Sequence, residues 1–208
     1  MKNTLQFSDK ILDENIAPEL SKLTKCGAPK LPVYPNYFSE YMLRSSLGGR
    51  KFKVAIHALL IVFFRRIDFA CLEYRNGRKM LGQYCKNLPS SNSKTRLFRM
   101  ALAHFETCIL HADAAIICLI TINKGLQQKT DRQPDDEYER MHKITNRIRH
   151  YDDDVFVKGK FKKQFHISPV WLTDKEIVTR QCTLTFNELQ EVLVAAMVDA
   201  KAFAEMLH

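Results

Sequence analysis

Two long stretches of apolar residues at helical spacing constrain this chain more than any other feature of its sequence. The first covers residues 51–74 and is apolar almost all round from Val54 to Phe64, which indicates a helix covered by neighbours on several sides. The second covers residues 94–124, where apolar side chains recur every three or four positions. A chain with two such helices is expected to fold as a helical bundle around them.

Glycines and acidic residues mark where the helices should end and begin. The pair Asn76-Gly77 predicts a break or kink in the first helix, followed by a shorter helical piece, and Gly125 should end the second. A third helix is predicted from the acidic residues 135–137 to about His150, because negative side chains favour the positive end of a helix.

The C-terminal part combines a strand pattern with a final helix. Residues 169–186 contain short apolar and β-branched runs, which predict a small β-hairpin. Thr185 and Glu188 form a T-x-x-E capping box that should start the last helix. The apolar stripe of that helix consists of Leu189, Val192, Leu193, Ala196, Met197, Ala200, Phe203 and Leu207.

The N-terminal part differs in composition. Four of the seven prolines precede Tyr37, so residues 1–47 are predicted to form a short helix and an extended lead-in strap that wraps the core. Residues 48–208 then form one domain with a β appendage at about 169–186, and a length of 208 residues suits a single core. The expected fold is mainly α, a bundle of about four to five core helices with the hairpin before the C-terminal helix.

The sequence favours a cytoplasmic protein outside any membrane. Charged residues interrupt the N-terminal segment before a secretory apolar block develops, and the apolar runs 58–64 and 112–122 fall short of a bilayer span. The six cysteines never occur as CxxC and lie mostly in apolar stretches, as reduced thiols do. Neither a glycine-rich phosphate loop nor a zinc-protease motif occurs, and no metal or cofactor is expected.

The net charge of +9 comes from one segment. Residues 43–100 carry 13 basic and two acidic side chains, whereas the rest of the chain is close to neutral. One interpretation is a surface that binds a polyanion, and the other is a solvated surface that also neutralises an acidic partner helix. The candidate nucleic-acid-binding residues in this segment are Arg65, Arg66, Arg75, Arg78, Lys79, Arg96 and Arg99.

The end of the third predicted helix gathers groups that suit phosphate chemistry. A spacing of four places His142, Asn146 and His150 on one helix face, and Arg149 lies one turn from Asn146. Metal-independent cleavage of RNA needs a group that moves protons near neutral pH, for which histidine is suited. It also needs a cation for the charge that develops on the phosphate, for which arginine is suited.

This stretch resembles the HEPN family, whose helical bundles often carry an Arg-Asn-x-x-x-His motif at the end of a core helix. Asn146 and His150 match that motif, whereas Thr145 occupies the arginine position, so Arg149 or Arg147 would have to supply the cation. By the order of its elements the resemblance covers roughly residues 50–208. It implies an RNA-directed role in a defence or toxin–antitoxin system, with an antitoxin or other protein partner. It also implies a homodimer that brings two motif helices together.

Simpler interpretations stay open beside the catalytic one. His150 can be a cation at a helix C-terminus with Asn146 bonded nearby, and the acidic residues 152–154 can cap a turn rather than bind a metal. The protein is then a non-catalytic module that binds nucleic acid or a partner protein through residues 43–100, or a scaffold or small-ligand protein.

Overall fold

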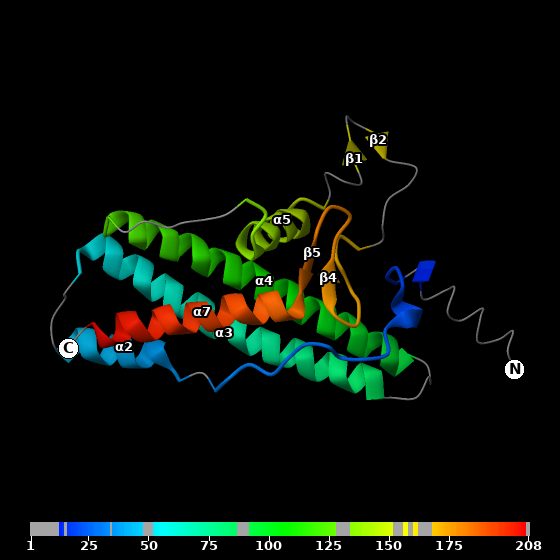
Figure 1. The fold of residues 1–208 in the computed structure, drawn as a ribbon, viewed down its shortest axis with the longest axis horizontal. Helices are drawn as coiled ribbons and strands as arrows, with labels where there is room; N and C mark the ends of the chain where they lie inside the picture. The colour runs from blue at the N-terminus through cyan, green and yellow to red at the C-terminus, as the bar shows by residue number, and fades with distance from the viewer. Residues whose placement is uncertain are drawn as a thin grey trace, which may run out of the picture.

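The computed structural model describes residues 13–14, 16–33, 35–47, 52–86, 92–127, 134–151, 156–157, 160–161 and 168–206. These residues form a mainly helical protein with a small antiparallel sheet before the C-terminal helix, as the sequence predicts (Figure 1). The elements are η1 (Leu20–Lys22), α2 (Tyr37–Leu47), α3 (Val54–Lys86), α4 (Asn92–Gly125), α5 (Glu137–Arg149), β1 (Phe156–Val157), β2 (Lys160–Phe161), β3 (Trp171–Leu172), β4 (Glu176–Val178), β5 (Thr183–Thr185) and α7 (Phe186–Glu205).

The core is built on a hairpin of two long antiparallel helices, α3 and α4, which contain 33 and 34 residues (Figure 1). Their shared interface contains both aromatic and small side chains. The rings of Tyr74 and Phe105 meet edge to face with centroids 5.8 Å apart, and Cys71 and Cys108 are both buried. All six cysteines of the chain are free thiols.

Helix α3 runs without interruption through Asn76 and Gly77, so the break predicted there is wrong. Gly77 is buried against α4, and a Cβ atom at this position would lie 3.1 Å from the ring of Phe105. The glycine therefore allows two helices to approach closely, and the packing offsets the cost of glycine in a helix interior.

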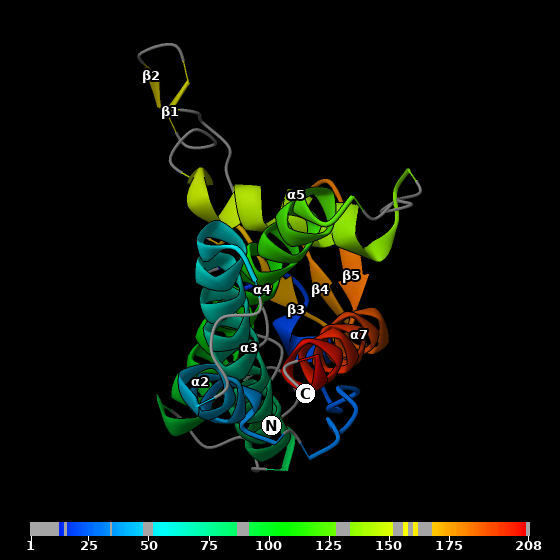
Figure 2. The same ribbon diagram turned by 90° about the vertical axis from the view of Figure 1, so that its left-hand side faces the viewer.

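Helix α7 packs against both α3 and α4 and covers one face of this hairpin (Figure 2). It begins with the predicted capping box: the Thr185 hydroxyl accepts from the Glu188 N–H at 3.1 Å, and the Glu188 carboxylate accepts from the Thr185 N–H at 2.8 Å. The predicted stripe is buried as far as Phe203, whose ring meets Phe63 of α3 at 6.2 Å. Leu207 lies outside the described residues.

The C-terminal sheet is a three-stranded meander, β3-β4-β5, rather than the two strands predicted. Two threonine hydroxyls make the turns. Thr173 accepts from the Glu176 N–H and Thr179 accepts from the Cys182 N–H, both at 3.1 Å. The stretch after α5 includes the short antiparallel pair β1-β2.

The N-terminal strap is fixed to the turn between β3 and β4. The Asp174 carboxylate accepts from the backbone N–H groups of Thr24 and Lys25 at 2.9 Å, and the Gly27 N–H donates to the Asp174 carbonyl at 2.9 Å. A Cβ atom at Gly27 would lie 2.1 Å from that carbonyl oxygen, so only glycine fits.

Residues 37–47 form helix α2, where the sequence predicts a continuation of the strap. The Asn36 side chain caps its first turn by accepting from the Ser39 N–H at 3.0 Å. Tyr41 is fully buried against Phe64, with ring centroids 4.8 Å apart, and its hydroxyl lies 2.6 Å from His57 Nδ1. Burial of this aromatic face stabilises the helix, although the proline-rich sequence before it obscures its sequence signal.

Among the described residues one helix, α4, is long and apolar enough to cross a membrane by length and composition. Less than half of its most apolar window, 44%, is buried. The core helix of a soluble bundle passes the same test, so this finding assigns the chain neither to the membrane proteins nor to the soluble proteins.

Candidate functional sites

Basic side chains gather at the end of the hairpin where α3 finishes and α4 begins. One groove of about 650 Å³ lies between the strap and the last turns of α3. Four cations and no carboxylate are among the described residues that line it, which are Thr24, Lys25, Cys26, Arg78, Lys79, Gly82, Gln83, Cys85 and Lys86. Its electrostatic potential therefore favours an anion.

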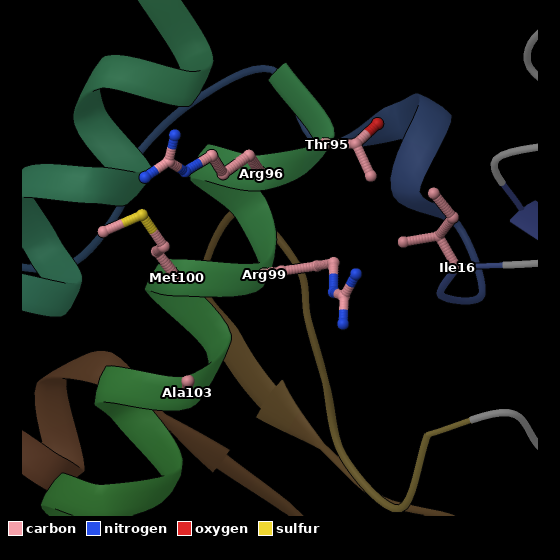
Figure 3. Close-up of a pocket in the computed structure, with 6 residues that line it drawn as sticks. All are labelled: Ile16, Thr95, Arg96, Arg99, Met100 and Ala103. Atoms are coloured by element: carbon pink, nitrogen blue, oxygen red, sulfur yellow. The ribbon is translucent and has the colours of Figure 1, made fainter. Parts of the chain in front are cut away.

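A second groove of about 590 Å³ lies at the same end of the hairpin, between the first turns of α4 and the N-terminal segment. Figure 3 shows Arg99 extending from α4 toward the segment that carries Ile16, while Arg96 points to the other side of the helix. Two arginines and no carboxylate are among the described lining residues, which also include Thr95, Met100 and Ala103.

Two of the predicted RNA contacts hold the strap in place. Arg75 Nη2 donates to the Pro32 carbonyl at 2.9 Å, and Arg78 Nε donates to the Ala28 carbonyl at 2.8 Å. Both side chains therefore have a structural task that sequence reasoning could not foresee. Their charge still adds to the positive potential of the hairpin end.

Two more of the seven predicted contacts, Arg65 and Arg66, lie in the middle of α3. Arg65 is exposed, whereas Arg66 Nη1 donates to His111 Nδ1 at 2.8 Å, and His111 stacks on Phe69 with centroids 5.3 Å apart. Burial, and next the charge of Arg66, lower the pKa of His111. The predicted basic patch is thus divided between the hairpin end and the middle of α3.

The α5 motif residues occupy the exposed end of their helix. Asn146 and Arg149 are exposed, Arg147 is half-buried, and His150 is the exposed C-cap residue, whose N–H donates to the Asn146 carbonyl at 3.0 Å. The helix therefore presents Asn146 and His150 one turn apart, as the spacing predicts.

Thr145, at the motif position that holds arginine in the HEPN pattern, points the other way. Its side chain is fully buried, and its Oγ1 has no hydrogen-bond partner among the described residues. Position 145 therefore faces the core, and any cation for the exposed face has to come from another residue.

Sequence reasoning missed the partner of His142. Its Nδ1 lies 3.0 and 3.2 Å from the two carboxylate oxygens of Asp113, which belongs to α4 and is only 3% exposed. The available signal was an acidic residue inside the apolar run 112–122. The pairing itself spans 29 positions of sequence, so no helical spacing could reveal it.

The hairpin end and the α5 site are separate (Figure 1). Asp113, where α5 contacts α4, lies fourteen residues after Arg99, which corresponds to roughly 21 Å along the helix. In Figure 2, α5 crosses above α4, and its C-terminal end lies on the α3 side, away from α7. One ligand has to be extended to reach both places.

The described part of the chain contains no cluster of three histidine, cysteine, aspartate or glutamate residues that would hold a metal ion. Asp152, Asp153 and Asp154 lie outside the described residues. Comparisons with family models, curated proteins and solved structures find no match to this chain.

Proposed function

We propose that this protein is a HEPN-like helical bundle that binds RNA through the basic end of its α3–α4 hairpin. The observation that carries the proposal is the pair of grooves at that end, lined by six cations and by no carboxylate among the described residues. Phosphate contacts by lysine and arginine provide most of the affinity of such an interface.

The lining of the grooves favours contacts with the backbone of RNA over contacts with its bases. No aromatic side chain is among the described lining residues of either groove, so bases have no ring on which to stack. Phosphate contacts position a nucleic acid without reading its sequence. The proposal therefore expects weak sequence preference for single-stranded RNA.

Equilibrium binding of a fluorescent single-stranded RNA tests this proposal. Lys79 and Arg99 line different grooves and take part in no hydrogen bond or ion pair among the described residues, so their reversal leaves the fold intact. The Lys79→Glu/Arg99→Glu variant should bind at least about tenfold more weakly at low salt.

The control reverses two charges at the opposite end of the same hairpin. Lys53 precedes α3, Lys124 is in the last turn of α4, and both are exposed. Lys53→Glu/Lys124→Glu changes the net charge equally, so it should keep nearly the parent affinity. Equal losses in both double variants would indicate a general charge effect and would contradict the proposal.

Cleavage of the bound RNA at the end of α5 is a second candidate function. The observation that favours it is the exposure of Asn146 and His150 one turn apart on the same face, with Arg149 beside them. In this proposal His150 is the acid or base, Asn146 positions the phosphate, and Arg149, or Arg147 in its place, stabilises the developing charge.

The same proposal places the protein in the cytoplasm, as a homodimer with an antitoxin-like or other protein partner. The alternative is a non-catalytic module whose basic hairpin end binds a protein rather than RNA. An acidic protein partner would compete with RNA for the hairpin end, and the two double variants above would locate that binding as well.

A further inference from the structure

A buried aspartate orients an exposed histidine beside the proposed cleavage site. Asp113 lies in the middle of α4 and is 3% exposed, and both of its carboxylate oxygens face His142 Nδ1 at 3.0 and 3.2 Å. A buried carboxylate without a partner is costly, so this contact stabilises the junction of α4 and α5. This structural role explains why Asp113 has a partner, but it does not explain why that partner is a histidine on the exposed face of α5.

The contact fixes which nitrogen of His142 can exchange a proton with a ligand. An ionised carboxylate only accepts hydrogen bonds, so Nδ1 is the donor and the neutral ring carries its lone pair on Nε2. The His142 side chain is 46% exposed, and Nε2 makes no hydrogen bond to a described residue. Asp113 and His142 thus have the relation of the aspartate and histidine in hydrolytic triads.

Two other polar histidine contacts differ from this one. His111 Nδ1 accepts from Arg66, so a neighbouring cation opposes its protonation. His104 pairs with Glu73 at 2.5 Å, but this pair lies where α3 and α4 meet, away from α5. Unlike these two histidines, His142 combines an almost fully buried carboxylate partner with a position on the motif face.

His142 and Asn146 lie one turn apart in α5, and His150 is the C-cap residue four positions further along the chain. Each four-residue step advances about 6 Å along the helix axis, so a phosphate held at Asn146 has one imidazole on each side at about that axial distance. The fully buried Thr145 adds nothing to this face, whereas the exposed Arg149 adds a cation.

We propose that His142, oriented by Asp113, is the general base of RNA cleavage at this face, with His150 as the general acid. This inference rests on the proposed RNA function. His142 Nε2 takes the proton of a ribose 2′-hydroxyl, and the 2′-oxygen attacks the adjacent phosphorus. The P–O5′ bond breaks as His150 gives its proton to O5′, which leaves a 2′,3′-cyclic phosphate and a 5′-hydroxyl.

In this proposal a second subunit is not needed to supply a proton-transfer group. The resemblance to the HEPN family implies a homodimer that brings two motif helices together, whereas here both imidazoles belong to one α5 helix. Asp113 is a positioning residue in this scheme, because it acts on RNA only through His142. A monomer then contains both proton-transfer groups.

The test uses the full chain and a short single-stranded RNA with one ribose flanked by 2′-deoxy positions. His142→Gln should lower the cleavage rate at least about 100-fold with little change in RNA affinity. The matched control is His104→Gln, which removes the other histidine–carboxylate pair and should cleave like the parent. A substrate without the 2′-hydroxyl should stay intact.

A substrate with sulfur in place of the bridging O5′ separates base from acid. A thiolate leaves without being protonated, so this substrate should restore most of the rate of His150→Ala but not that of His142→Gln. Restoration of both variants, or of His142→Gln alone, would overturn the assignment. Circular dichroism checks folding, and His142→Asn replaces the glutamine variant if that variant unfolds.

Asp113→Asn tests whether Asp113 positions His142. The readout is the tautomer of His142, which a change in stability alone does not alter. In the parent, ¹⁵N NMR of the histidines should show His142 with its proton on Nδ1, and the variant should lose that tautomer and most of its turnover while retaining RNA affinity.

The outcomes distinguish this inference from the function on which it rests. A parent protein that binds RNA with the salt dependence of phosphate contacts but cleaves none overturns the inference and leaves the binding proposal intact. Cleavage by His142→Gln at the parent rate also overturns it. A parent protein that binds no RNA contradicts the proposed function itself.

Discussion

Glu106 of α4 is a carboxyl group in surroundings that exclude most water, and burial raises its pKa to about 7. In the unfolded chain the group ionises at its ordinary pKa near 4.5. The unfolded state therefore releases the proton first as the pH rises. The contribution of protonated Glu106 to the free energy of unfolding is fully present below pH 4.5. It is lost as the pH rises toward and through about 7.

Glu106→Gln should remove this pH dependence. The variant keeps the size of the side chain without the charge, so near pH 8 its free energy of unfolding should be higher than the parent's. The difference between variant and parent near pH 8 should exceed the difference near pH 4 by on the order of 3 kcal/mol. Urea unfolding at the two pH values measures the difference, and an equal effect at both would contradict the prediction.

Thr145 offers a second test at the residue scale, because its buried hydroxyl has no partner among the described residues. Thr145→Val removes the hydroxyl and keeps the shape, so it should raise the free energy of unfolding by about 1 kcal/mol. Thr145→Arg introduces the arginine of the HEPN pattern but buries a charge, and it should cost more than about 3 kcal/mol. Thermal unfolding compares both variants, and a well-tolerated arginine would show that position 145 can reach solvent.

Single residues also show how far sequence reasoning reached at the α5 site. The common face of Asn146 and His150 was predictable, because it follows from helix geometry alone. The burial of Thr145 depends on how α5 is rotated against its neighbours, and the Asp113–His142 contact depends on where α5 crosses α4. Both are properties of packing between elements distant in sequence.

At the scale of elements, α3 and α4 were predictable because apolar spacing and the terminal Gly125 carry their signal locally. The continuity of α3 was not, since a glycine pattern alone cannot distinguish a helix break from a packing glycine such as Gly77. Helix α2 was missed because the preceding prolines obscured the cap formed by Asn36.

Two glycines of α3 should respond to alanine in opposite ways. A Cβ atom at Gly77 would press on Phe105, whose ring is fixed between Tyr74 and Phe186, so Gly77→Ala should destabilise the protein by about 1–3 kcal/mol. Gly82 has no atom within 4 Å of the same position, so Gly82→Ala should stabilise by about 0.5–1 kcal/mol. Thermal unfolding of the two variants checks the contrast, and destabilisation by both would show that α3 needs flexibility rather than space.

At the scale of the whole molecule, the basic segment 43–100 does not form one surface. Sequence reasoning located the charge correctly in the chain, but the hairpin carries Arg65 and Arg66 to its middle and the cations of both grooves to its end. The strap adds Lys25 from outside the segment. The hairpin end and the α5 face remain roughly 21 Å apart along α4, so RNA that reaches both must be extended.

The salt dependence of RNA binding tests the central claim most directly. Each lost phosphate contact lowers the slope of log affinity against log salt by about 0.7 for a single strand. The Lys79→Glu/Arg99→Glu variant should therefore show a slope shallower than the parent's by about 1.4, with Lys53→Glu/Lys124→Glu matching the parent. Parent-like slopes in the hairpin-end variant, or a larger loss in the control, would contradict RNA binding at the hairpin end.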